Sequence, residues 1–97
     1  MTDVDSQLAE ARRRFASGDL RGARDNCERA AEADPDNAEV AHMLGLLASR
    51  EGDTEAAVRH FERAVELDPG DAPGFNNLGT AYRALDRLDE AERRYRR

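Results

Sequence analysis

Residues 38–71 read AEVAHMLGLLASREGDTEAAVRHFERAVELDPGD. On both sides of Gly52, apolar residues recur every three or four positions, which is the spacing of a helix with one buried face. Gly52 can adopt the left-handed conformation that ends a helix, and the Asp53 side chain can cap the next one. Pro69 cannot continue a helix, so it marks the end of the second helix. This stretch is therefore predicted to form a helical hairpin.

The hairpin pattern is repeated along the chain. A shift of 34 residues aligns Gly18-Asp19 with Gly52-Asp53, Asp34-Pro35 with Asp68-Pro69, and Leu44-Gly45 with Leu78-Gly79. A repeat of this length indicates an array of stacked helical units. We predict one domain over residues 1–97, made of repeats 4–37, 38–71 and 72–97, the last of them incomplete.

The fold class expected from this pattern is all-α, because alternating strand patterns are absent and β-branched residues are sparse. The predicted helices cover residues 4–17, 20–33, 38–50, 54–67, 72–84 and 88–97. These helices would pair as three hairpins and stack into a solenoid.

Small residues are expected where two helices approach closely. Glycine in the middle of a helix costs about 1 kcal/mol relative to alanine, so Gly45 and Gly79 need a packing reason. We expect Gly45 to face Ala57 and Gly79 to face Ala91 across their hairpins, as Ala11 faces Ala23. Larger side chains are expected to fill the remaining gaps, namely Phe61, Phe75, Tyr82 and Tyr95.

These residues make the chain resemble the tetratricopeptide repeat family. The small positions of the repeat are matched by Ala11, Gly45 and Gly79, by Ala23, Ala57 and Ala91, and by Ala30 and Ala64; the proline position is matched by Pro35 and Pro69. The resemblance implies a right-handed superhelix of helical hairpins that binds proteins. The first unit departs from the pattern with Gln7, Glu10 and Arg14, which we expect on a partly solvated outer face.

The resemblance also implies where a partner would bind. In this family the first helix of each repeat lines a concave groove, and the matching residues here are Leu8, Arg12, Phe15, Glu39, His42, Met43, Leu46, Ser49, Arg50, Asn76, Asn77, Thr80 and Arg83. The peptide-carboxylate clamp of the co-chaperone subfamily is not matched. The stretch from Asn76 to Tyr82 is similar to repeats of O-GlcNAc transferases, although Asn77 alone does not make an asparagine ladder.

Composition excludes several function classes. The chain of 97 residues has a formal net charge of −6 and a pI of about 4.9, so nucleic-acid binding is not expected. No apolar run is long enough for a membrane span, and the acidic N-terminus does not resemble a signal peptide. We therefore expect a cytoplasmic protein without membrane contact. Arginine supplies all 15 basic residues, which suggests a GC-rich, bacterial genome.

Candidate chemistry is limited to three side chains. Cys27 fits a small core position better than a reactive thiol. His42 and His60 fall on different predicted helices without other ligands at metal-binding spacing. We therefore expect no metal, no cofactor and no catalytic site.

The function predicted from the sequence is that of a non-catalytic protein–protein interaction module whose groove takes a peptide or a partner protein. The alternative is a recruiting or regulatory segment at the N-terminal side of a larger enzyme, of the sulfotransferase, glycosyltransferase or hydroxylase type. We also expect concentration-dependent homo-oligomers through the incomplete third repeat, because its apolar residues would lack a neighbour.

Overall fold

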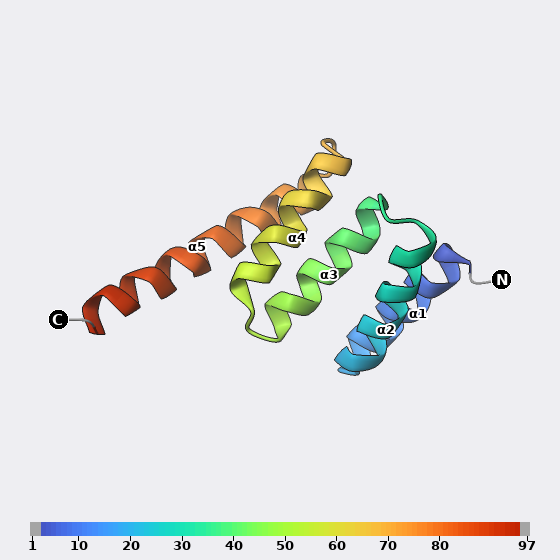
Figure 1. Ribbon diagram of the computed structural model, residues 1–97, viewed down its shortest axis with the longest axis horizontal. Helices are drawn as coiled ribbons and strands as arrows, with labels where there is room; N and C mark the ends of the chain where they lie inside the picture. The colour runs from blue at the N-terminus through green and yellow to red at the C-terminus, as the bar shows by residue number, and fades with distance from the viewer. Residues whose placement is uncertain (1–2, 96–97) are drawn as a thin grey trace.

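The computed structural model describes the backbone of residues 3–95 and the side chains of residues 3–89. Its helices are α1 (Val4–Ser17), α2 (Leu20–Ala33), α3 (Ala38–Arg50), α4 (Thr54–Leu67) and α5 (Ala72–Tyr95). They lie side by side in an elongated row that measures 55 × 29 × 20 Å (Figure 1). The predicted all-α solenoid is confirmed, and the first four helices have the bounds predicted from the sequence.

The two hairpin turns follow the predicted chemistry. Gly18 and Gly52 are left-handed, with φ of 89° and 83°. Asp19 caps α2 by accepting a hydrogen bond from the Gly22 amide, and Asp53 caps α4 in the same way. A left-handed residue stops one helix and a carboxylate starts the next, so each hairpin closes within two or three residues.

The third hairpin does not form, because α5 is one unbroken helix of 24 residues. The predicted end near residue 84 and the predicted separate helix at 88–97 are therefore wrong for the part that the structure describes. Asp86 occupies the repeat position of the turn glycines, and Arg87 occupies that of the capping aspartates. Without a left-handed glycine or an N-cap, nothing in the sequence stops the helix. The second half of α5 extends past α4 (Figure 1).

Gly45 is a site of close approach, as predicted, and its nearest neighbour is the Phe61 ring. A Cβ atom at position 45 would lie 2.6 Å from Cε1 of the Phe61 ring. Phe61 is only 2% exposed and joins the core between α4 and α5. The Phe61 ring therefore occupies the space that a side chain at position 45 would need.

The corresponding prediction for Gly79 is wrong. A Cβ at this position would meet only Arg83 Nη1, at 3.9 Å. Ala91 lies farther along the same helix, so it cannot face Gly79 across a hairpin. Phe75 and Tyr82 were also predicted to fill gaps in a third hairpin. Along the unbroken α5 they are 49% and 42% exposed. The predicted role of Tyr95 lies outside the described side chains.

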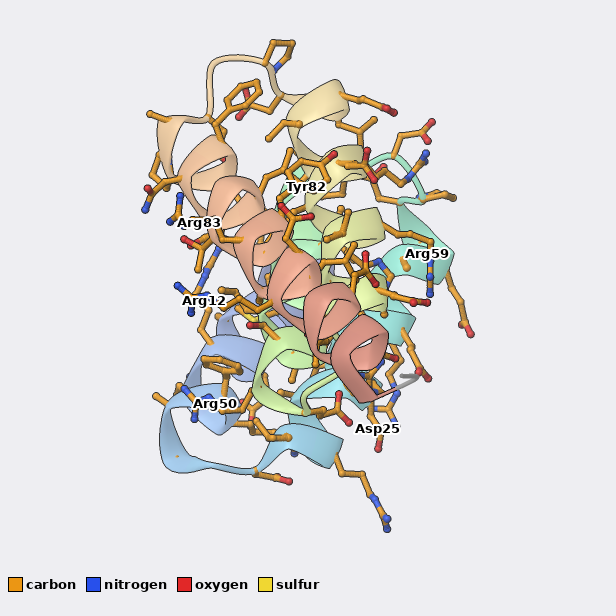
Figure 2. All side chains as sticks on the ribbon, turned by 90° about the vertical axis from the view of Figure 1, so that its left-hand side faces the viewer. Arg12, Asp25, Arg50, Arg59, Tyr82 and Arg83 are labelled. Atoms are coloured by element: carbon orange, nitrogen blue, oxygen red, sulfur yellow. The ribbon has the colours of Figure 1, made fainter. Side chains whose placement is uncertain are left out.

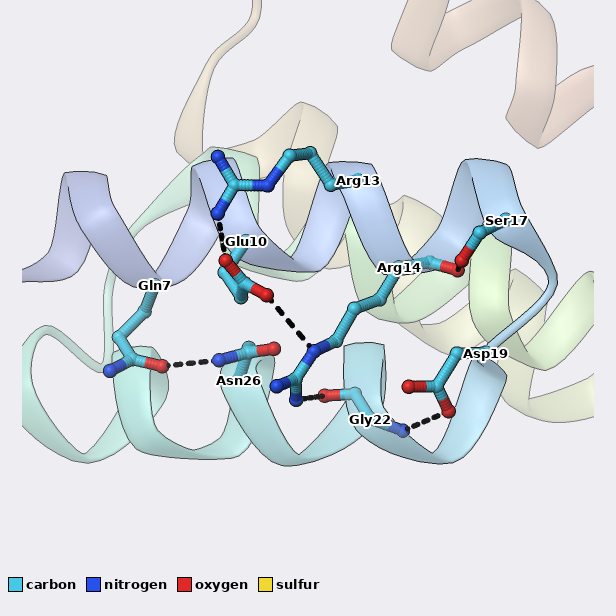
Figure 3. Close-up of polar contacts among 8 residues, drawn as sticks. All are labelled: Gln7, Glu10, Arg13, Arg14, Ser17, Asp19, Gly22 and Asn26. Atoms are coloured by element: carbon cyan, nitrogen blue, oxygen red, sulfur yellow. Dashed lines mark hydrogen bonds and ion pairs between the residues drawn. The ribbon is translucent and has the colours of Figure 1, made fainter.

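Three polar residues of α1 turn toward α2 rather than outward (Figure 3). Gln7 Oε1 accepts a hydrogen bond of 2.6 Å from Asn26 Nδ2, and Asn26 is only 3% exposed. Glu10 pairs with Arg14 at 3.1 Å, and Arg14 Nη1 donates to the Gly22 carbonyl at 3.3 Å. The expected solvated outer face is thus a half-buried polar seam that ties the first hairpin together.

Helix α5 has the length of a membrane-spanning segment, but its sequence carries charged residues such as Arg83, Asp86 and Arg87. Within residues 3–95, no helix combines sufficient length with the apolar character that a membrane crossing requires.

Candidate functional site: the face of α1, α3 and α5

The odd-numbered helices share one face of the molecule. Figure 2 shows Arg12 of α1, Arg50 of α3 and Arg83 of α5 along one side, with Arg59 of α4 and Asp25 of α2 on the opposite side. We call the surface on the side of Arg12, Arg50 and Arg83 the groove face. The alternation arises because each hairpin places its first helix on this side and its second helix on the other.

The larger depression on the groove face has a volume of about 440 Å³. We call it the acidic cavity. Its lining consists of Arg12, Ala38, Glu39, His42, Met43, Leu46, Asp68 and Asp71. Met43 is buried and Leu46 is half-buried, so α3 supplies an apolar floor. Volumes of 300–1,000 Å³ with an apolar base and a few polar groups are typical of ligand pockets.

Charges at the rim of the acidic cavity do not cancel. Arg12 forms an ion pair with Glu39, which joins α1 to α3 and neutralises both groups. Asp68 and Asp71 come from the connection between α4 and α5, and His42, 3.4 Å from Asp71, is the one lining residue besides Arg12 that can carry a positive charge. The cavity therefore carries a net negative charge.

His42 stands between the acidic cavity and α5. Its Nδ1 atom lies 3.4 Å from Asp71 Oδ2, and its Nε2 atom lies 3.1 Å from Asn77 Nδ2. The Phe61 ring contacts it edge-on, with centroids 5.7 Å apart. His42 thus has polar neighbours at both ring nitrogens, Asp71 at Nδ1 and Asn77 at Nε2.

A smaller depression of about 100 Å³ continues the groove face between α3 and α5. Its lining consists of Leu46, Ser49, Thr54, Ala57, Phe61, Asn77, Thr80, Ala81 and Ala84. Leu46 belongs to both depressions, so they form one continuous surface. Beside it, the guanidinium of the exposed Arg50 lies 4.7 Å from the centre of the half-buried Phe15 ring, which is a cation–π contact.

The structure brings most of the predicted groove residues together. Arg12, Glu39, His42, Met43 and Leu46 line the acidic cavity, and Leu46, Ser49, Asn77 and Thr80 line the smaller depression. Phe15 and Arg50 pair beside them. Arg83 donates to Thr80 Oγ1 at 3.2 Å, and Asn76 is exposed on α5 outside both depressions.

Leu8 does not belong to the groove face. It is 2% exposed and packs with Ala30 and Val40 in the core between the first two hairpins. Its predicted role in the groove is therefore wrong for this conformation, because α3 covers this position of α1.

Two acidic residues that line the acidic cavity are not among the groove residues predicted from the sequence. They are Asp68 and Asp71, the two aspartates of the connection between α4 and α5. Both carboxylates line the cavity because the short connection between α4 and α5, which contains Pro69 and Gly70, passes close to α3. The signal that could have found them is the pair of aspartates flanking this connection.

Cys27 and His60 are both shielded from solvent to a degree that shifts their pKa values. Burial raises the pKa of the Cys27 thiol to about 11, and Cys27 packs with Ala11, Ala23 and Leu47. Burial also lowers the pKa of His60, and the nearby Arg59 adds to this effect. Among the described residues, no group of three potential ligands could hold a metal ion.

The raised pKa of Cys27 predicts a loss of stability at alkaline pH. Above about pH 9 the thiol of the unfolded chain ionises while the native thiol keeps its proton until about pH 11. The unfolded state then binds fewer protons than the native state, so stability falls as the pH rises through this window. Urea unfolding at pH 8 and pH 10.5 should show a larger loss for wild type than for Cys27→Ala. Equal losses would mean that Cys27 does not hold its proton in the native state.

Comparisons with known proteins agree with this architecture. One family model, described as tetratricopeptide repeat, matches residues 8–72, and a second with the same description matches residues 48–97. A solved structure of the Thermobaculum terrenum O-GlcNAc transferase, K341M mutant, is similar with a TM-score of 0.78 and 36% identity. The similarity covers 84% of this chain and 16% of that one. A search of curated proteins gave no match.

Proposed function

Because the chain belongs to the tetratricopeptide repeat family, we propose that it is a non-catalytic interaction module that binds an extended peptide segment along the groove face. The observation that supports this most directly is the continuity of the two depressions through Leu46. Together they offer an apolar floor with polar groups on both sides. An extended peptide can bury alternate side chains in such a groove while its backbone meets polar groups such as Asn77.

A second candidate function is recruitment within a larger enzyme. The similar solved structure is an O-GlcNAc transferase, and the present chain spans only 16% of it. In this alternative the groove face would present a protein substrate to a catalytic part elsewhere in the polypeptide. The local activity of residues 1–97 would still be peptide binding, so one experiment tests the shared step.

The experiment uses a fluorescein-labelled, acetylated pool of random nonapeptides and measures fluorescence anisotropy. We expect saturable binding to wild type. Ser49 and Thr80 are exposed at the smaller depression, so the double variant Ser49→Arg/Thr80→Arg fills the groove without disturbing the core. We expect this variant to bind at least about tenfold more weakly, as for loss of a central interface contact.

The matched control is Asp25→Arg. It changes the net charge by the same amount as the double variant, but it lies on the side opposite Arg12 and Arg83 (Figure 2). Its affinity should equal that of wild type. If the control weakens binding as much as the double variant, the groove face is not the binding surface.

Three further proposals concern the domain organisation, the cellular compartment and self-association. We propose that residues 1–97 form one domain with repeats 4–37, 38–71 and 72–97, and that the protein is cytoplasmic. We also propose concentration-dependent self-association through α5. Phe75, Tyr82 and Leu88 support it, because all three are exposed along this helix.

A further inference from the structure

We propose that the acidic cavity is the subsite for an arginine side chain of the bound peptide. This inference rests on the proposed function and adds the chemistry of one ligand side chain. The cavity offers an apolar floor, Met43 and Leu46, below two carboxylates, Asp68 and Asp71. An arginine has the matching distribution, with an apolar stem and a planar cationic head.

The carboxylates of Asp68 and Asp71 have different polar neighbours. Asp71 Oδ2 lies 3.4 Å from His42 Nδ1, and His42 Nε2 lies 3.1 Å from Asn77 Nδ2. Asp68 Oδ1 accepts the Gly70 amide at 3.3 Å, and its side chain is exposed to the cavity mouth. Charge-assisted hydrogen bonds to carboxylates are stronger than those between neutral groups.

The neighbouring charges favour a cation over an anion or a neutral group. The only cationic side chain of the lining with a fixed charge is Arg12, which is already paired with Glu39. A glutamate in this cavity would meet the carboxylates of Asp68 and Asp71. Arginine suits the cavity better than lysine, because its forked head can donate to two carboxylates at once.

The test compares three labelled nonapeptide pools that differ only at the fixed central residue: arginine, citrulline or glutamate. Citrulline has nearly the shape of arginine but no charge. At physiological ionic strength, which screens long-range attraction, wild type should bind the arginine pool about tenfold more tightly than the citrulline pool. The glutamate pool should bind most weakly.

The variant Asp68→Asn/Asp71→Asn removes the charge and keeps the fold. Asparagine caps a helix as well as aspartate does, so α5 can still begin at Ala72. In this variant the arginine and citrulline pools should bind equally, at the wild-type affinity for citrulline. The control Asp25→Asn/Asp86→Asn has the same change in net charge at two exposed positions outside the cavity, and it should keep the preference.

The outcomes separate this inference from the proposed function. If wild type binds arginine and citrulline pools equally while Ser49→Arg/Thr80→Arg still abolishes binding, the groove function stands and the arginine subsite is wrong. If the preference survives in Asp68→Asn/Asp71→Asn, it arises outside the cavity and the subsite is wrong. If no pool binds saturably, both proposals fail.

Discussion

Replacing Phe61 with alanine should lower the free energy of unfolding by about 3–5 kcal/mol, the largest loss expected for truncating any one of the side chains described between residues 3 and 89. The ring is 2% exposed and occupies the space left by Gly45. It also packs with Val58, Val65 and Leu78, so it joins the second hairpin to α5. Removing it would open a cavity that the glycine cannot fill, because position 45 has no side chain.

Urea unfolding followed by circular dichroism at 222 nm measures this loss. The matched control is Phe75→Ala, since Phe75 is about half exposed and its truncation should change stability by roughly 0.5 kcal/mol. Similar losses for the two variants would show that Phe61 is not the anchor between α4 and α5. A marginal protein with the usual 5–15 kcal/mol of stability can lose most of it through this one change.

The sequence was most informative where one residue type has a single physical use. Gly18 and Gly52 are left-handed and Asp19 and Asp53 cap helices, so the first four helices were predicted to the residue. The third unit was predicted by extending the period, although Asp86 and Arg87 do not have the chemistry of a turn. The 34-residue period alone does not produce a turn, because the residues at the turn positions decide whether the helix ends there.

The candidate site was predicted in part for a related reason. Arg12, His42 and Leu46 line one cavity, as implied by the resemblance to the tetratricopeptide repeat family. Such a resemblance identifies equivalent positions within each repeat. It does not show where a connection between helices returns, which is why Asp68 and Asp71 were missed. Nor does it show how deeply a neighbouring helix covers a position, which is why Leu8 was misplaced.

A second large effect is expected from filling the space at Gly45. By helix propensity alone, replacing a mid-helix glycine with alanine should stabilise a protein by about 1 kcal/mol. At position 45 the new Cβ would lie 2.6 Å from the Phe61 ring, a buried group that cannot move into solvent. We therefore expect Gly45→Ala to be destabilising, and Gly45→Leu to cost about 1–3 kcal/mol or more through overpacking.

Gly79 provides the matched control, because it occupies the same repeat position and lies within helix α5. A Cβ there meets only the end of the flexible Arg83 side chain, at 3.9 Å. Gly79→Ala should therefore show the propensity gain of about 1 kcal/mol that Gly45→Ala does not. Thermal and urea unfolding of the variants at a low, fixed protein concentration decide the matter. If both Gly→Ala variants are more stable than wild type, Phe61 can move away from position 45. If both are less stable, Gly79 faces a neighbouring helix, as in a closed third hairpin.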